Sequence, residues 1–339
     1  MPNNTHHAIV IGINSYPDIG LAQLKGPIND ANDFYDWLSD PSGGNVPASN
    51  IRRILSTDFG TQKDCPTPNQ VEALFEPFIL GGVQGKLGDR LYIFVAGHGF
   101  GDPQDMNKTA LYAANAKMMF PWHIAVTEYV NWLHCNAVFE EIVLIMDCCR
   151  AINSLHEIQK PQYVSLQYGG NIPLPAASKV RFFYAFAVGR GGLARENTFD
   201  NGKTSGFFTK AVLDALRNAR PLQGEVTGQQ LKNHIHNCMD KFAQNKDIVP
   251  PEIRLDSSRD IMFFKRRTAS TVPVTIKLDS YLGNETLALY DGSGQEIRQM
   301  QATAADLTLD LEPGLYKITV NNTGRKEFFQ VPNNEQIIV

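Results

Sequence analysis

Residues 141–150 read EIVLIMDCCR: five aliphatic or sulfur-containing apolar residues in a row, followed at once by an aspartate, two cysteines and an arginine. A short unbroken apolar run of this kind is typical of a strand that is buried on both faces of a sheet. The same character recurs at 8–13 (AIVIGI), 89–96 (DRLYIFVA) and 180–188 (VRFFYAFAV). The sequence therefore predicts several central strands, one of which ends in a group of reactive side chains.

The stretches between these runs have the spacing of amphipathic helices. Such spacing predicts helices over 28–38, over 70–79 after a capping residue at Thr67, over 206–219 and over 229–242. Strands that alternate with helices form a mostly parallel sheet flanked by helices, so we expect an α/β fold. Ligands of such sheets bind beyond the carboxyl ends of the strands, where residues 147–150 would lie.

The periodicity changes after Phe264. A basic and polar stretch, KRRTAST, covers 265–271, and short segments of alternating hydrophobicity separated by turn residues follow it. We therefore predict an α/β domain over 1–264, a linker over 265–271 and a small all-β sandwich of immunoglobulin-like type over 272–339.

Composition excludes several classes of protein. The 339 residues are 43% hydrophobic and carry a formal net charge of −4, so neither disorder nor a nucleic-acid or membrane partner is favoured. No apolar run approaches the ~20 residues of a membrane helix, and the start, MPNNTHH, lacks the basic residues of a signal peptide. Five irregularly spaced cysteines argue against a disulfide framework, so we expect a cytoplasmic protein with free thiols.

A histidine and a cysteine follow two of the predicted strands. The strand that ends at Ala96 continues into Gly97, His98 and Gly99, and the strand that ends at Met146 is followed by the two cysteines. A nucleophilic thiol needs a base within hydrogen-bond reach, and neighbouring strand ends would supply one. A buried structural histidine is the competing interpretation of His98, but two flanking glycines make it the weaker one.

These motifs resemble the caspases and metacaspases, members of a clan of cysteine peptidases that share the caspase–haemoglobinase fold. The resemblance covers about residues 6–264 and depends on the GHG motif and on a Cys-Arg pair whose cysteine lies 51 positions later. HHAIVIGINSY, LKGPINDAND and SGFFTKAVLDAL add to it. Prokaryotic relatives with an added domain often belong to defence or cell-death cascades, which is implied by resemblance only.

The resemblance implies roles for the residues at the strand ends. Cys149, directly before Arg150, would be the nucleophile, with His98 as acid and base and the backbone amides of Gly99 and Cys149 as the oxyanion hole. Cys148 would be a small buried filler, the alternative being a redox partner of Cys149.

The resemblance also implies specificity. In metacaspases the residues that match Asp30 and Asp147 line the pocket for a basic P1 side chain, whereas caspases use arginines to bind aspartate. Two neighbouring carboxylates repel each other unless a cation arrives, which agrees with Arg or Lys at P1. The competing interpretations are a solvated helix charge for Asp30 and a strand-end cap for Asp147.

Other polar residues have weaker interpretations. Glu196 would border the substrate cleft, although a plain surface charge is the simpler reading. Neither His6 with His7 nor His234 with His236 has the spacing of a metal site, so we predict no metal and no cofactor. Calcium-binding acidic clusters are not evident, which makes calcium activation doubtful. The connection after the second cysteine is long, which indicates a functional or mobile segment. In the family that the sequence resembles, processing occurs there, which implies Arg150, Lys160 and Lys179 as candidate self-cleavage points.

The leading hypothesis is thus a cysteine endopeptidase that cleaves proteins or peptides after Arg or Lys, with an upstream activating partner or protease in its cascade. One alternative is a catalytically idle pseudo-peptidase that serves as a scaffold. The other is a caspase-like peptidase with a preference for Asp or Asn.

Overall fold

The computed structural model describes residues 2–152, 157–159, 161, 177–199, 201–219, 225–243, 248–256, 258–265, 271–277, 285–302, 306–331 and 337–338. The chain forms two compact units, one of Met1–Leu213 with Asp247–Arg259 and one of Asp214–Lys246 with Asp260–Val339. Each unit has its own hydrophobic core. No helix within these described ranges is long and apolar enough to cross a membrane.

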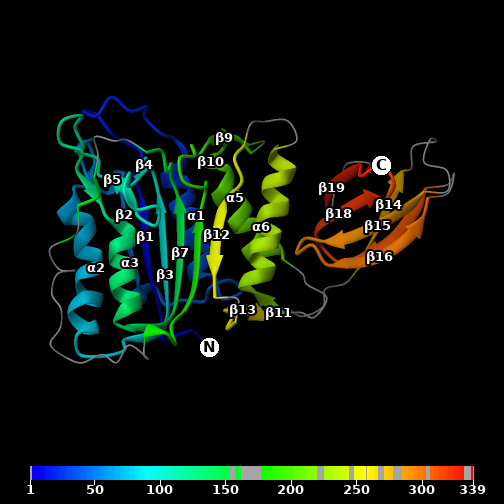
Figure 1. Cartoon of the computed structure of the whole chain (residues 1–339), viewed down its shortest axis with the longest axis horizontal. Helices are drawn as coiled ribbons and strands as arrows, with labels where there is room; N and C mark the ends of the chain where they lie inside the picture. Colours follow the sequence, from blue (N-terminus) through cyan, green and yellow to red (C-terminus); the bar gives the residue numbers. More distant parts are fainter. Residues whose placement is uncertain are drawn as a thin grey trace. The chain divides into compact units, whose positions relative to one another are not determined.

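A six-stranded sheet forms the centre of the first unit (Figure 1). Its order is β12-β8-β7-β3-β1-β2, with β1 at His6–Gly12, β2 at Ile51–Leu55, β3 at Gly88–Ala96, β7 at Phe139–Asp147, β8 at Arg181–Phe186 and β12 at Glu252–Leu255. All neighbours are parallel except β12, which pairs antiparallel with β8. The predicted mostly parallel sheet is confirmed, and each of the four apolar runs forms a strand.

The described part of the chain contains the four predicted helices, together with one that the sequence analysis did not predict. They are α1 (Gly26–Ser39), α2 (Pro68–Gly82), α5 (Phe207–Asn218) and α6 (Gly228–Ala243), and the additional helix is α3 (Val126–Cys135). Short 3-10 turns lie at Ala48–Asn50 and Ser56–Phe59. Thr67 caps α2 as expected, and its amide donates a 2.8 Å hydrogen bond to the Gln70 side chain.

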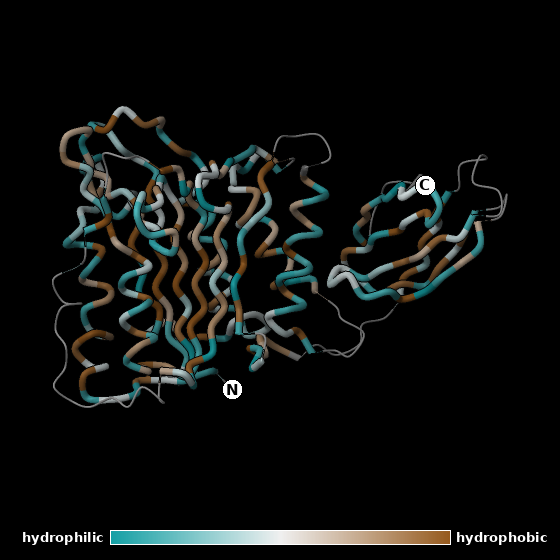
Figure 2. The backbone as a smooth tube through the Cα atoms, in the orientation of Figure 1, coloured by the Kyte–Doolittle hydropathy of each residue, from teal (hydrophilic) through white to brown (hydrophobic). Residues whose placement is uncertain are grey.

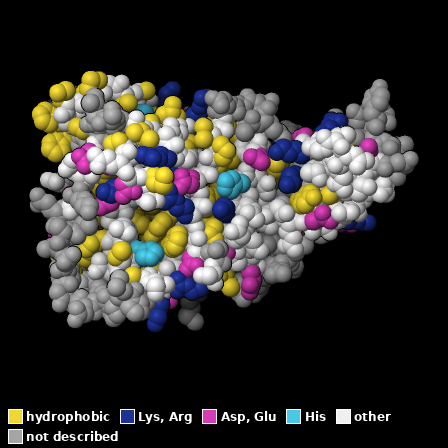
Figure 3. Space-filling model, viewed as in Figure 1, with side chains coloured by type: hydrophobic (Ala, Val, Ile, Leu, Met, Phe, Trp, Pro, Cys, Tyr) yellow, Lys and Arg dark blue, Asp and Glu magenta, His cyan; other side chains and the backbone are white. Residues whose placement is uncertain are grey.

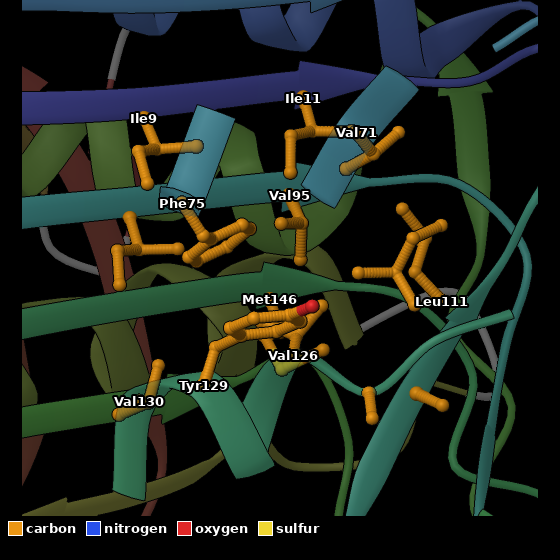
Figure 4. Close-up of a cluster of buried hydrophobic side chains, with 14 of the residues drawn as sticks. Ile9, Ile11, Val71, Phe75, Val95, Leu111, Val126, Tyr129, Val130 and Met146 are labelled. Carbon is orange, nitrogen blue, oxygen red and sulfur yellow. The ribbon is translucent and has the colours of Figure 1, made fainter. Parts of the chain in front are cut away.

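Both faces of the central strands are apolar because helices cover both of them. Figure 2 shows the hydrophobic residues concentrated along these strands. On one face, Ile9 and Val95 belong to a cluster with Phe75 from α2 and Tyr129 from α3 (Figure 4). Alternate strand residues point the other way, and there Phe94 stacks on Phe34 of α1 with ring centroids 4.7 Å apart.

Small sheets surround the carboxyl ends of the strands. The chain after β3 forms an antiparallel sheet of β4 (Gly99–Gly101), β5 (Thr109–Tyr112) and β6 (His123–Ile124). The chain after β8 forms a hairpin of β9 (Glu196–Thr198) and β10 (Thr204–Gly206), which leads directly into α5. The described loops beside His98 and Cys149 therefore come from sequence-distant parts of the chain.

In the second unit, β11 (Glu225–Thr227) pairs with β13 (Met262–Lys265), and two further sheets face a common core. These sheets are β17-β14-β20 and β16-β15-β18-β19, with β14 at Val272–Lys277, β15 at Thr286–Asp291, β16 at Glu296–Gln301, β17 at Leu307–Leu311, β18 at Gly314–Val320, β19 at Lys326–Val331 and β20 at Ile337–Ile338. This confirms the predicted β-sandwich. The sequence analysis missed β16 because this edge strand has no fully buried residue and hence little alternation.

We expect Phe75→Ala to destabilise the first unit strongly. The side chain is fully buried and stacks on Tyr129 with ring centroids 4.5 Å apart, and a cavity of this size costs about 3–5 kcal/mol. Leu80→Ala on the same helix is the matched control, because Leu80 is 52% exposed and its loss should cost less than about 0.5 kcal/mol. Urea unfolding followed by tryptophan fluorescence measures both, and equal midpoints for the two variants would contradict this core assignment.

Candidate active site

The register of β3 and β7 places His98 and Cys149 at the same level of the sheet. Ala96 lies opposite Asp147, and the next amide, that of Gly97, donates a 3.2 Å hydrogen bond to the Asp147 carbonyl. His98 and Cys149 each follow two residues after this matched pair. The register therefore places the histidine and the cysteine at adjacent strand ends, where a nucleophile and its base would be needed.

The imidazole of His98 is held by groups that the sequence analysis did not identify. Its Nε2 lies 2.7 Å from the Ala22 carbonyl oxygen. A carbonyl only accepts, so Nε2 carries the proton and Nδ1 keeps its lone pair. The backbone amide of His98 donates to the hydroxyl of buried Tyr16 at 2.8 Å, and the two rings lie 4.8 Å apart. Gly97, at φ +155°, leaves room for that hydroxyl, with which a side chain would collide.

Both members of the pair are biased toward their neutral forms. Burial raises the pKa of the half-buried Cys149 thiol, and a backbone hydrogen bond of Ala194 offsets part of that effect. Burial lowers the pKa of His98, and the Ala22 carbonyl and the charge of Glu196 offset part of that effect. A neutral imidazole beside a neutral thiol is the arrangement of a general base rather than of a preformed ion pair.

The structure distinguishes the two adjacent cysteines. Cys148 is 1% exposed, and its Sγ would lie 2.7 Å from a Cβ added to Gly99. The thiol therefore packs against the glycine, which agrees with the filler interpretation of Cys148. Cys149 is the more accessible of the two, and its amide donates no hydrogen bond to another described group.

Arg150 is an internal anchor for the segment that carries Cys149. Its side chain is 1% exposed, forms an ion pair with Glu252 of β12 at 2.5 Å and donates to Thr109 Oγ1 at 3.0 Å. A side chain so enclosed cannot enter a substrate pocket, so the suggestion of self-cleavage after Arg150 is wrong for the folded chain. Lys179 is exposed, and Lys160 lies outside the described residues.

Asp30 and Asp147 lie on either side of Gly206. The carboxylate of Asp30 accepts hydrogen bonds from the Ser205 hydroxyl and, at 3.0 Å, from the Gly206 amide. The carboxylate of Asp147 accepts from the amide and hydroxyl of Thr209 at 3.0 and 2.6 Å, and a side chain on Gly206 would collide with it. Both aspartates are buried, which argues against a solvated helix charge at Asp30.

Glu196 is a third carboxylate at this place rather than a plain surface charge. It accepts hydrogen bonds from the amides of Lys25 and Gly26, the latter at 2.8 Å, and so occupies the N-terminus of α1. A Cβ added to Gly26 would lie 2.9 Å from the Glu196 carboxylate and 3.2 Å from that of Asp30. The order of residues along the chain does not reveal this role, because Lys25 and Glu196 are separated by 171 positions.

Asp30 and Asp147 resist ionisation in the absence of a cation. Burial, and then the charge of Asp147, raise the pKa of Asp30 well above its ordinary value. Burial raises the pKa of Asp147 to about 6, with a further contribution from the charge of Glu196, although the Thr209 hydrogen bonds act against both. Such a group of acids is a complementary site for a guanidinium or ammonium.

A separate cluster of Asp214, His234 and Cys238 in the second unit could hold a metal, since one donor atom of each lies within 4.8 Å of the others. Asp214 already accepts hydrogen bonds from His234 Nε2 at 2.8 Å, Cys238 Sγ at 3.4 Å and Asn218 Nδ2 at 2.9 Å. These three hydrogen bonds satisfy the Asp214 carboxylate without a metal ion. The sequence analysis compared His234 with His236 and overlooked the cysteine one helical turn further on.

A family model described as "Caspase domain" matches residues 5–250. A probable protease from a Desulfuromonadales bacterium is 25% identical over 362 residues, which cover 96% of this chain and 42% of that protein. The chain thus spans less than half of the length of this curated relative.

Solved structures that are similar to the chain include the following two. Caspase-1 from Spodoptera frugiperda matches with a TM-score of 0.49 and 15% identity, over 79% of this chain and 93% of that one. A protein from Geobacter sulfurreducens matches with a TM-score of 0.45 and 13% identity, over 78% of this chain and 97% of that one.

We expect alkylation of Cys149 by iodoacetamide to accelerate with pH well into the alkaline range. The raised pKa of the thiol means that the reactive thiolate forms above the ordinary thiol range, and it is lost as the pH falls. Mass spectrometry of the Cys149 peptide separates this signal from that of exposed Cys135. A rate for Cys149 that is already constant at neutral pH would show a preformed ion pair and contradict this assignment.

Proposed function

The chain belongs to the caspase domain family of cysteine peptidases, and we propose that it is an endopeptidase that cleaves protein substrates after Arg or Lys. The observation that carries the specificity is the pair of buried carboxylates, Asp30 and Asp147, on either side of Gly206. A basic P1 side chain would supply the missing positive charge, and a guanidinium can bind carboxylates through two parallel hydrogen bonds. Glu196 adds a third negative charge.

The proposed reaction uses the groups described above. The Nδ1 atom of His98 accepts the thiol proton while Sγ of Cys149 attacks the carbonyl carbon of the scissile bond. The amides of Gly99 and Cys149 donate to the oxygen on which negative charge develops. The tetrahedral intermediate then collapses, the C–N bond breaks and His98 returns the proton to the departing amine. Water finally hydrolyses the thioester and frees Cys149.

The charges argue against the alternative specificity. An aspartate at P1 would lie close to Asp30, Asp147 and Glu196. Repulsion between like charges would make its binding there unfavourable. The scaffold alternative would not require a precisely held histidine. The backbone amide and the ring of His98 are both held by hydrogen bonds, which favours a catalytic role.

Other parts of the proposal rest on sequence reasoning. We place the peptidase in 1–264, a linker in 265–271 and an accessory sandwich in 272–339. The five free cysteines fit a reducing, cytoplasmic location. An upstream activator and a role in a defence cascade stay predictions. Activation by calcium is tested in the assay below by adding calcium or a chelator.

Fluorogenic peptides that end in Arg, Lys, Asp or Asn, assayed with calcium and with chelator, test the proposal. We expect cleavage after Arg and Lys only, with Cys149→Ala reducing it by roughly 10³-fold or more. Cys148→Ala is the matched control and should retain activity. Asp30→Asn should lower kcat/KM for Arg by about 10- to 100-fold, because it removes a charged hydrogen-bond partner.

Two outcomes would overturn parts of this proposal. Cleavage after Arg that is equally fast in Asp30→Asn would exclude this carboxylate from the P1 site. If no peptide is cut and an Arg-directed covalent inhibitor leaves Cys149 unlabelled, the protein is either a zymogen that awaits its activating partner or a scaffold, and the proposal of an active peptidase is overturned.

The pH dependence gives a further prediction. Asp147 is neutral below its pKa of about 6 and charged above it, so kcat/KM for Arg peptides should rise through that range. Thr209→Val removes the hydroxyl that stabilises the charged form and should move this rise to higher pH. A pH–rate profile that is the same in wild type and Thr209→Val would show that Asp147 does not control binding of the basic side chain.

A further inference from the structure

Large apolar side chains project into solvent from two neighbouring loops, and we call this group the apolar patch. Its members and their exposed fractions are Leu21 37%, Met118 70%, Met119 83%, Phe120 62% and Trp122 52%. Figure 3 shows hydrophobic side chains gathered at the upper left of the first unit, at the end of the sheet where the small β4-β5-β6 sheet lies in Figure 1. Contiguous exposed apolar surface usually marks a binding surface.

The patch is built on a defined backbone. Lys117 and Phe120 exchange amide-to-carbonyl hydrogen bonds of 2.9 and 3.0 Å, which places Met118 and Met119 at the tip of a tight turn. The amide of Ala113 donates to the Trp122 carbonyl at 2.9 Å and fastens the base of this turn beside β5. Backbone hydrogen bonds on both sides of the turn therefore hold the apolar tip in its exposed position.

The patch is continuous with the site. Lys117 forms a 3.8 Å ion pair with Asp18, and the end of the Met118 side chain lies 4.0 Å from the position of a Cβ on Gly20. Two residues further along the same loop, the carbonyl of Ala22 accepts a hydrogen bond from His98 Nε2. The patch therefore lies on the Nε2 side of the imidazole, whereas the proposed function assigns the opposite atom, Nδ1, to Cys149.

We propose that the apolar patch binds the substrate segment that follows the scissile bond and selects substrates with large apolar side chains there. This inference rests on the proposed function. The P1 side chain points to the carboxylates at the start of α1, and His98 protonates the departing amine. That amine is the first atom of the following segment, so the segment starts at the imidazole and continues beyond it.

The chemistry of the patch suits such an occupant. Two methionines have flexible, polarisable side chains that adapt to different apolar partners, and Phe120 and Trp122 offer broad flat surfaces. The patch thus favours apolar residues without requiring one particular sequence. The carboxylates would fix the position of cleavage, and the patch would choose among proteins that contain the same basic residue.

Three substrates with the same residues up to and including Arg test the inference. The short one carries a fluorogenic amine directly after Arg. The two long ones are internally quenched peptides that continue with Leu-Phe-Leu or with Ser-Ser-Ser. The patch variant combines Met118→Ser, Met119→Ser and Phe120→Ser, and the matched control is Leu80→Ser on α2, where Leu80 is 52% exposed.

We expect wild type and Leu80→Ser to prefer the Leu-Phe-Leu peptide over the Ser-Ser-Ser peptide by about 10-fold or more in kcat/KM. The patch variant should lose this preference. Relative to wild type, its kcat/KM should fall about 10-fold more on the Leu-Phe-Leu peptide than on the short substrate.

The outcomes separate the two proposals. If wild type cuts the short substrate and the patch variant keeps the full preference for Leu-Phe-Leu, the inference is wrong and the proposed function stands. If wild type cuts none of the three, the proposed function fails and the inference fails with it. Binding of wild type to phosphatidylglycerol vesicles that is lost in the patch variant, with no change in peptide preference, would assign the patch to a membrane surface instead.

Discussion

The site depends on the parallel pairing of β3 with β7. Because Ala96 lies opposite Asp147, each chain leaves the sheet at the same level, and the residues that follow meet without a long loop. A shift of one residue would turn alternate side chains of a strand to the other face of the sheet. The helices packed on both faces stabilise this register, since apolar residues point in both directions from the central strands.

Electrostatics gives the site an asymmetry. On one side of Cys149 lie three carboxylates, held by the hydrogen bonds of Ser205, Gly206 and Thr209 and by the N-terminus of α1. On the far side of His98 lies exposed apolar surface. Under the proposed function, charge at one end and hydrophobicity at the other would give a polypeptide substrate a direction, because a basic residue and apolar residues would bind at opposite ends of the site.

Backbone groups contribute as much to this arrangement as side chains do. A carbonyl at Ala22 orients the imidazole, and amides at Lys25, Gly26 and Gly206 bind carboxylates. Glycine at 206 is required because any side chain would collide with Asp147. Backbone contacts of this kind carry no residue-type signal, which is why the sequence analysis identified His98 and the aspartates but not the groups that hold them.

The sequence by itself determined the elements whose signal is local. Unbroken apolar runs identified the central strands, alternation identified most of the sandwich, and a histidine and a cysteine directly after two such runs marked the candidate site. Only the tertiary structure decided that Glu196 joins Asp30, that Arg150 is an internal anchor and that Met118 lies beside the loop of Ala22. Each of these facts is a contact between residues far apart in the chain, and such contacts arise only when packing of the whole core brings the loops at one end of the sheet together.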